Sequence, residues 1–95
     1  MKNQIRILVK GRVQGVFYRN YTQEFALNLG IKGKVRNLKN GDVEIFAHGE
    51  KEQLESLINW TKKGSPLSKV TDVSFDEIDF NSIVWTEFFV EQGKY

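Results

Sequence analysis

Apolar residues alternate with other side chains near the start of the chain, which is the pattern of a strand with one face on a core. The alternating positions are Ile5, Ile7 and Val9. Gly11 marks the expected end of this strand. From Tyr18 onward the apolar positions follow helical spacing instead, at Tyr21, Phe25, Ala26 and Leu29. Gly30 is a typical helix stop, so we expect a helix between Tyr18 and Gly30.

A hairpin is predicted in the next part of the chain. Two short runs alternate with period 2, the first at Gly33, Val35 and Asn37 and the second at Val43, Ile45 and Ala47. Between these runs, Asn40-Gly41 is the strongest short-range signal for a two-residue hairpin turn.

The rest of the chain predicts a second helix and two more strands. The helix has an apolar stripe at Leu54, Leu57, Ile58 and Thr61, and Trp60 lies near its end. Gly64 closes this helix, and Ser65-Pro66 prevents its continuation. An irregular alternation at Val70, Val73 and Phe75 predicts a fourth strand, and Val84, Thr86, Phe88 and Val90 predict a fifth. Asn81-Ser82 fits the turn between them.

The order βαββαβ predicts an α+β fold of the ferredoxin-like type, in which two helices pack on one face of an antiparallel sheet and the other face is open to solvent. The chain has 95 residues, so we expect residues 1–95 to form a single domain.

Composition excludes several kinds of functional site and says less about where in the cell the protein acts. A formal charge of +2 suits a small anion and is far from that of a basic nucleic-acid arm. The absence of cysteine excludes disulfides, a thiolate nucleophile and a Cys-ligated zinc. No apolar run reaches membrane-spanning length, and no signal-peptide cleavage site follows the first strand. We therefore expect a cytoplasmic protein that binds neither membrane nor nucleic acid.

The segment GRVQGVFYR, from Gly11 to Arg19, combines features of an anion-binding loop. Arg19 lies in the first helical turn, where a cation is disfavoured by the helix dipole unless an anion binds there. Gly15 permits left-handed backbone conformations that turn successive amides into one concavity. The guanidinium of Arg19 matches two phosphoryl oxygens at a time. The alternative is a tight strand-to-helix turn with a solvated arginine.

Asn37 is the polar exception on the strand face assigned to the helices, because it shares that face with Val35. Its place near the strand end puts it beside the mouth of the predicted loop, where its amide can hydrogen-bond a water and the backbone. The alternative is an asparagine that satisfies a turn.

Together, GRVQGVFYR and GKVRNLKNG resemble the two signature segments of the acylphosphatase family, G-x-V-Q-G-V-x-[Phe/Tyr]-R and G-x-V-x-N. The resemblance extends over nearly the whole chain and implies the ferredoxin-like fold. It implies that Arg19 binds the phosphoryl group together with the loop amides of Gln14, Gly15, Val16, Phe17 and Tyr18. It also implies that Asn37 orients the attacking water.

Two positions depart from the family pattern. Lys34 stands where many members carry tryptophan, and Asn40 replaces an aspartate. Both lie beside the predicted site, so we expect an effect on stability or substrate preference and no loss of activity.

The resemblance implies hydrolysis of small acyl phosphates to a carboxylate and inorganic phosphate. A carboxylate leaving group, with a conjugate acid of pKa ~4, departs without a proton donor. The loose transition state requires mainly that three phosphoryl oxygens be held and a water aligned. We therefore predict in-line attack by water, with no metal, cofactor or covalent intermediate, in a monomer. His48 is predicted to be an exposed residue without a catalytic role.

Two other functions remain open at this stage. A nucleic-acid module would stack bases on the open sheet face, where Phe46, Trp85 and Phe89 alternate. Glu44, Glu87 and Glu91 share that face and disfavour such binding. A regulatory domain would bind phosphate without turnover.

Overall fold

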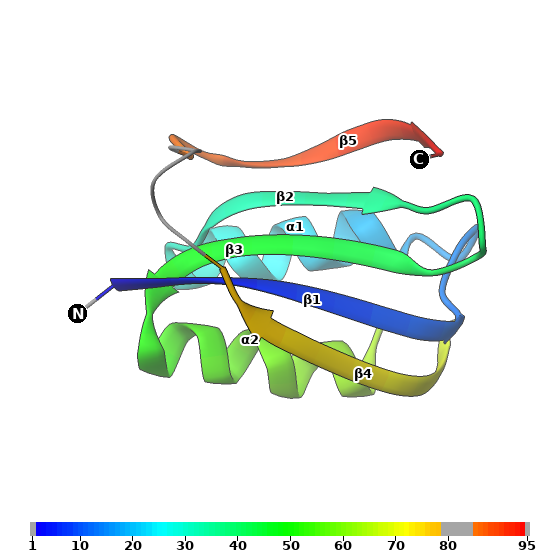
Figure 1. Ribbon diagram of the computed structural model, residues 1–95. Coiled ribbons are helices and arrows are strands. Elements are labelled where there is room, and N and C mark those ends of the chain that lie inside the picture. Colours follow the sequence, from blue (N-terminus) through cyan, green and yellow to red (C-terminus); the bar gives the residue numbers. More distant parts are fainter. Residues whose placement is uncertain (1, 79–84, 95) are drawn as a thin grey trace.

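Helices and strands form two layers, with the helices on one face of a single sheet (Figure 1). The computed structural model describes residues 2–78 and 85–94. In this part of the chain the elements are β1 (Lys2–Arg12), α1 (Tyr18–Leu29), β2 (Lys32–Asn37), β3 (Val43–Glu50), α2 (Lys51–Lys63), β4 (Lys69–Glu77) and β5 (Phe88–Lys94). The layers and the element order confirm the predicted ferredoxin-like fold.

The strands lie in the order β4-β1-β3-β2-β5. Neighbouring strands from β4 to β2 are antiparallel, as predicted, whereas β5 pairs with β2 in parallel. The chain leaves β4 at one edge of the sheet and returns at the opposite edge, where β5 runs in the same direction as β2 (Figure 1). The sheet is therefore mixed.

The fifth strand starts later in the structure than the sequence predicts. β5 starts at Phe88, and the described residues Trp85 and Thr86 precede it. Alternating apolar and polar residues predict which face a side chain occupies, but strand pairing also needs a partner backbone, and β2 pairs with β5 only from Phe88 onward. The predicted turn at Asn81-Ser82 and the position Val84 lie outside the described residues.

The core lies between the sheet and the helices. Alternate strand residues supply one side of it, at Ile5, Ile7, Val9, Val35, Val43, Ile45, Ala47 and Phe88. The helices add Ala26, Leu54, Leu57 and Ile58. Trp60 joins the two helices, because its ring lies 5.3 Å from that of Tyr18 and 5.6 Å from that of Phe25. This burial confirms the predicted periodicities of the second helix and of the hairpin. In the first helix Ala26 is buried and Phe25 and Leu29 pack against the core, but the predicted stripe position Tyr21 is 43% exposed, because the side of α1 that faces the core carries Tyr18 and Thr22 instead.

The turn between β2 and β3 is wider than predicted. Its residues run from 38 to 42, and the amide of Leu38 donates to the carbonyl of Asp42 at 2.8 Å. The carboxamide oxygen of Asn40 accepts a hydrogen bond from the amide of Asp42 at 3.0 Å. This side chain closes the turn locally, so Asn40 keeps a turn-forming role although Asn40-Gly41 is not a two-residue hairpin turn.

The sheet face away from the helices is covered by ion pairs and aromatic rings. Arg6 and Arg36 each lie 2.5 Å from a carboxylate oxygen of the buried Glu44. Lys34 pairs with Glu91 at 2.7 Å, and its ammonium lies 5.6 Å from the ring centre of Phe46. The charged groups of these side chains make this face of the sheet polar. Their long aliphatic parts lie across the face and cover part of it from solvent.

Candidate active site

The loop between β1 and α1 turns sharply because two of its residues have left-handed backbone conformations. Gly15 has φ 74° and Phe17 has φ 61°. Glycine adopts this region freely, whereas a bulky residue pays about 1–2 kcal/mol there. Phe17 is the N-cap of α1, and no side chain caps that end of the helix. The amides of the first turn have no intrahelical acceptors, so they are available to an anion at the helix start.

Hydrogen bonds from the loop to distant elements hold it in place. The Gln14 side-chain amide donates to the carbonyls of Leu38, at 2.7 Å, and Asp42, at 2.9 Å. On the other side, the Ser65 hydroxyl donates to the carbonyl of Val16 at 3.0 Å. The loop is therefore fixed between the β2–β3 turn and the segment that follows α2.

Tyr18 anchors the start of α1 in the core. Its hydroxyl donates to the carbonyl of Thr61 at 2.8 Å, and its side chain is 1% exposed. Burial in an apolar environment raises the pKa of Tyr18 above its ordinary value, because the charged phenolate would lose its hydration. Tyr18 is therefore a neutral structural anchor directly beside Arg19.

Arg19 is the second residue of α1, and β5 orients its side chain. One guanidinium nitrogen, Nη1, donates to the backbone carbonyl of Glu91 at 3.0 Å. Arg19 is partly buried and lines a cavity at the N-terminus of the helix, so the other N–H groups of its guanidinium are available to a ligand there. The predicted place of Arg19 in the first helical turn is confirmed.

Asn37 is the last residue of β2 and is 6% exposed. Its carboxamide oxygen Oδ1 is buried and accepts no hydrogen bond from the residues that the structure describes. A buried acceptor without a donor costs about 1–3 kcal/mol. The oxygen is therefore suited to accept a hydrogen bond from a water or a ligand.

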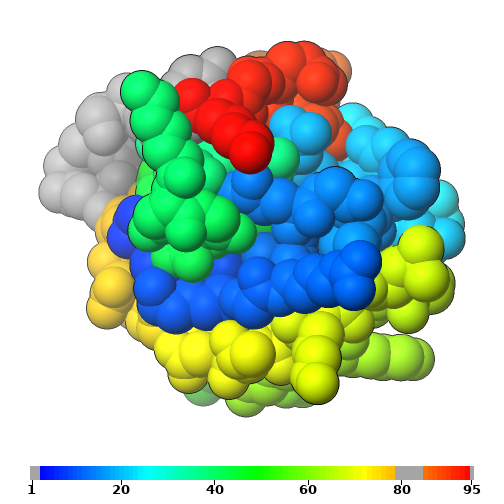
Figure 2. Space-filling model, turned by 90° about the vertical axis from the view of Figure 1, so that its right-hand side faces the viewer, coloured from blue at the N-terminus to red at the C-terminus, as the bar shows by residue number. Residues whose placement is uncertain are grey.

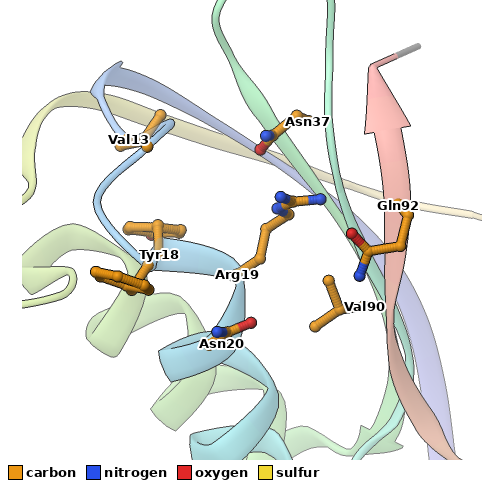
Figure 3. A pocket seen from close by; sticks show the side chains of 9 residues that line it. Val13, Tyr18, Arg19, Asn20, Asn37, Val90 and Gln92 are labelled. Atoms are coloured by element: carbon orange, nitrogen blue, oxygen red, sulfur yellow. The ribbon is translucent and has the colours of Figure 1, made fainter.

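Arg19 and Asn37 lie in the wall of one cavity of about 330 Å³. Figure 3 shows the Arg19 guanidinium extending from α1 toward the Asn37 carboxamide at the end of β2. Gly15, Phe17 and Tyr18 of the predicted loop also line this cavity. Gln14 and Val16 belong to the same loop but are not among the residues that form the wall. The space-filling view in Figure 2 shows the blue loop, the green β2–β3 turn and the red end of β5 close together at this end of the molecule.

The cavity wall includes further residues at Val13, Asn20, Val90 and Gln92 that sequence reasoning did not assign to the site. Val90 and Gln92 come from β5, and their side chains point toward the site in Figure 3. The period-2 pattern already put Val90 on the helix face of its strand, and Gln92 continues that pattern. The missing information was that β5 lies next to β2.

The cavity presents hydrogen-bond donors and a cation to an anionic ligand. Among residues 2–78 and 85–94, no cluster of three or more His, Cys, Asp or Glu side chains forms a metal-binding group. His48, in β3, is partly buried and is not part of the cavity wall. Such an arrangement can bind a phosphoryl group and hold a water beside it.

The aromatic residues of the open sheet face contact one another. The Trp85 ring lies 6.3 Å from that of Phe46 and 6.1 Å from that of Phe89, in tilted pairs. Lys34 lies 5.7 Å from the Trp85 ring centre. Because these partly buried rings already have partners within the sheet, this face does not present the free stacking platform that base binding needs.

Comparisons with known proteins show which family the chain resembles. Residues 5–89 match the family model "Acylphosphatase". An acylphosphatase of Syntrophobacter fumaroxidans is 46% identical over 79 residues, covering 83% of this chain and 81% of the relative. One from Methylococcus capsulatus is 41% identical over 87 residues, covering 92% and 94% of the two chains. The crystal structure of acylphosphatase from Bacillus subtilis superposes with a TM-score of 0.88 at 40% identity, covering 97% of this chain and all of that one (100%).

Within the part of the chain that the structure describes, no helix is long and apolar enough to cross a membrane.

Proposed function

The chain belongs to the acylphosphatase family, and we propose that Arg19, Asn37 and the β1–α1 loop form its catalytic site. The family activity is hydrolysis of the bond between a carboxyl group and a phosphate. The observation that carries the site assignment is the buried Asn37 Oδ1, which has no donor among the described residues and belongs to a side chain in the wall of the same cavity as Arg19.

Arg19 and the loop amides bind the phosphoryl group in this proposal. The guanidinium donates to two phosphoryl oxygens, and the amides from Gln14 to Tyr18 surround the rest of the group. These donors are already oriented before substrate binds, because Glu91 holds Arg19 and because Gln14 and Ser65 hold the loop. Preorganised donors stabilise the charge of the transition state without further rearrangement.

Asn37 orients the nucleophile. Its Oδ1 accepts a hydrogen bond from a water molecule and so aligns an oxygen lone pair of that water with the phosphorus. An amide is not a base, so the proton of the water passes to a phosphoryl oxygen of the substrate or to solvent. The new P–O bond forms as the bond from phosphorus to the carboxylate oxygen breaks, and the carboxylate leaves with the electron pair.

Removal of either side chain tests the assignment. We expect Arg19→Ala and Asn37→Ala each to lower kcat/KM for acetyl phosphate by about a hundredfold or more, as for other preorganised donors. Arg19→Lys should recover only part of the activity, because an ammonium cannot donate a planar pair of hydrogen bonds. Phosphate release measured with purified protein in the presence of chelator gives the rates.

Matched exposed residues serve as controls. Arg12 and Asn28 are exposed and lie outside the cavity wall, so Arg12→Ala and Asn28→Ala should stay within about threefold of wild type. Circular dichroism establishes that all variants are folded. Wild-type rates in a folded Arg19→Ala or Asn37→Ala variant would contradict the proposal.

We further propose that the chain acts as a monomer on small acyl phosphates, because Arg19, Asn37 and the β1–α1 loop come together within one fold and need no residue from a second copy. Size-exclusion chromatography of the active protein tests this part of the proposal. A dimer that loses activity on dissociation would contradict it.

A further inference from the structure

Exposed cations surround the end of the molecule that contains the proposed catalytic site. β1, β2, β5 and α2 finish at this end, and α1, β3 and β4 begin there (Figure 1). Figure 2 looks onto this end and shows the yellow start of β4 below the blue loop and the red end of β5 above it. Six exposed side chains here form what we call the basic end: Arg12, Lys39, Lys62, Lys63, Lys69 and Lys94.

The carboxylates near the basic end have other cations beside them. Asp42 pairs with Lys10 at 2.9 Å, and Asp72 lies opposite the same lysine in the β1–β4 register. Glu91 pairs with Lys34 at 2.7 Å. Within residues 2–78 and 85–94, none of the six side chains of the basic end forms an ion pair. Their charges are therefore not neutralised by a neighbouring carboxylate in this part of the chain.

The opposite end of the molecule has the reverse character. Exposed carboxylates lie there at Glu52, Glu55, Asp76, Glu77 and Glu87. The exposed cations Lys32 and Lys51 also lie at that end, at the starts of β2 and α2. The fold thus separates exposed charge between its two ends, and the cavity with Arg19 lies at the basic one.

Helix dipoles explain only part of this separation. Lys62 and Lys63 lie in the last turn of α2 and Glu52 lies in its first, which is the arrangement that the dipole favours. α1 has no acidic residue in its first turn, so no carboxylate competes there with an anion. Lys39 and Lys69 lie in a turn and at the start of a strand, where no helix dipole acts on them. A bound anion at the cavity accounts for the whole set.

The distances involved are short enough for these charges to act on a substrate. A cleft surrounded by charges of one sign raises the association rate of an oppositely charged ligand by about 10–10³-fold. The screening length is about 30 Å in 0.01 M salt and about 10 Å in 0.1 M salt. The molecule is 33 Å in its longest dimension. Charges at the basic end therefore act on an anion near the cavity, whereas those at the opposite end are largely screened.

We propose that the basic end attracts the acyl phosphate anion to the cavity, so that cations outside the cavity wall raise kcat/KM without contacting the substrate. None of the six side chains belongs to the wall. This inference rests on the proposed function, because it requires an anionic substrate that enters this cavity.

Two matched double variants test the proposal. Lys62→Glu with Lys69→Glu changes the basic end, and Lys32→Glu with Lys51→Glu changes the opposite end by the same charge. Each pair combines one lysine of α2 with the first residue of a strand. Hydrolysis of acetyl phosphate is measured in about 0.01 M and about 0.5 M sodium chloride. Chloride that competes for the phosphate site affects wild type and variants alike, so each variant is compared with wild type at the same salt.

The variant of the basic end should lose about tenfold in kcat/KM at low salt, through KM, with kcat unchanged. At high salt its kcat/KM should lie within about twofold of wild type, because the charges are screened. The opposite pair should stay within about twofold at both salt concentrations. Lys62→Gln with Lys69→Gln makes half the charge change and should lose about threefold at low salt. It supplies the measurement if the glutamate variant does not fold, since glutamate at position 62 opposes the dipole of α2.

Three results would overturn the proposal. The first is a low-salt kcat/KM within about twofold of wild type in the folded Lys62→Glu, Lys69→Glu variant. The second is a loss that persists at high salt, which would indicate a contact or a structural role. The third is an equal loss in the two pairs, which would indicate net charge alone. If instead the catalytic assignment fails, Arg19→Ala hydrolyses acetyl phosphate at wild-type rates, whatever the lysine variants show.

Discussion

Asn37 and Phe17 each carry a local cost at the same cavity. The buried Oδ1 of Asn37 has no donor among the described residues, and Phe17 holds a left-handed backbone. Such costs are each of the order of 1–3 kcal/mol, which is a sizeable share of the stability of a small domain. Their coincidence at one cavity is what we expect if the cavity is the proposed catalytic site, because local strain of this kind is concentrated at functional sites.

Tyr18 links stability to alkaline pH. Its pKa is raised by burial, whereas an unfolded tyrosine titrates near pH ~10. The folded state therefore keeps its proton when the unfolded state loses it. The stability contributed by neutral Tyr18 is complete below about pH 10 and declines as pH rises above it toward the raised folded pKa.

The variant Tyr18→Phe tests this linkage. It removes the hydrogen bond to Thr61 and should lower the free energy of unfolding at pH 7 by about 1 kcal/mol. Above pH 10 its stability should fall less steeply than that of wild type. Urea unfolding between pH 7 and pH 11 measures both effects. An equally steep alkaline decline in the variant would show that Tyr18 is not the group responsible.

Single residues of the site were predictable where a local pattern specifies them. The glycine loop and the helix start place Arg19 in the first helical turn, and period-2 alternation places Asn37 on the helix face of its strand, but only the resemblance to the family joined the two residues in one predicted site. The contact from Arg19 to the Glu91 carbonyl was not predictable, because it depends on backbone placed there by a strand pairing that no local pattern encodes. The left-handed Phe17 was hidden for a related reason, since sequence patterns favour glycine at such positions.

At the scale of elements, two glutamines join parts of the chain at opposite ends of the molecule (Figure 1). Gln14 ties the β1–α1 loop to the β2–β3 turn through two carbonyls. Gln53 accepts a hydrogen bond from the amide of Glu50 and donates to the carbonyl of Leu29, joining the start of α2 to the end of α1. Only the hydrogen bonds of Gln14 set the position of the β1–α1 loop relative to Asn37.

Substitution of each of the two glutamines gives a matched pair of predictions. Gln14→Leu and Gln53→Leu should each destabilise the fold by about 1–3 kcal/mol, because each leaves partly buried backbone groups without partners. Gln14→Leu should also lower kcat/KM by about tenfold or more, since misplacing a positioned group is costly to rate. Gln53→Leu should leave kcat/KM within about twofold of wild type, because its joint is far from the cavity. Urea unfolding and phosphate release at a temperature where both variants are folded separate the two effects. Equal activity losses would contradict the positioning role of Gln14.

The elements themselves were largely predictable, because each has its own periodicity and stop signal. Both helices end where Gly30 and Gly64 predicted. The sequence signal failed at the hairpin turn, where the closing bonds run between Leu38, Asn40 and Asp42 rather than across Asn40-Gly41 alone. The sequence signal also failed at the start of β5, because an edge strand can begin only where the backbone of its partner strand is available for pairing.

At the scale of the whole molecule, binding of the product should stabilise the fold. A ligand that binds only the folded state adds about 2.7 kcal/mol at a hundred times its dissociation constant. For a domain of this size, each kcal/mol raises the thermal midpoint by about 4–8 °C. The midpoint of the wild type should therefore rise with inorganic phosphate, and that of Arg19→Ala should not. Differential scanning fluorimetry, with sodium chloride at equal ionic strength as control, measures the shift. A shift that persists in Arg19→Ala would place the anion elsewhere.

The pairing of β5 beside β2 also bears on how the enzyme gains activity as it folds. The Arg19 side chain and the Glu91 carbonyl are 72 residues apart in sequence. Contacts of such long separation are slow to form, because a large loop must close before they contribute. A chain with its hairpin and helices already formed still lacks the acceptor that orients the guanidinium. Recovery of hydrolysis during refolding therefore reports the docking of the last strand and the completion of the sheet, and it is a stricter measure of native structure than helix content.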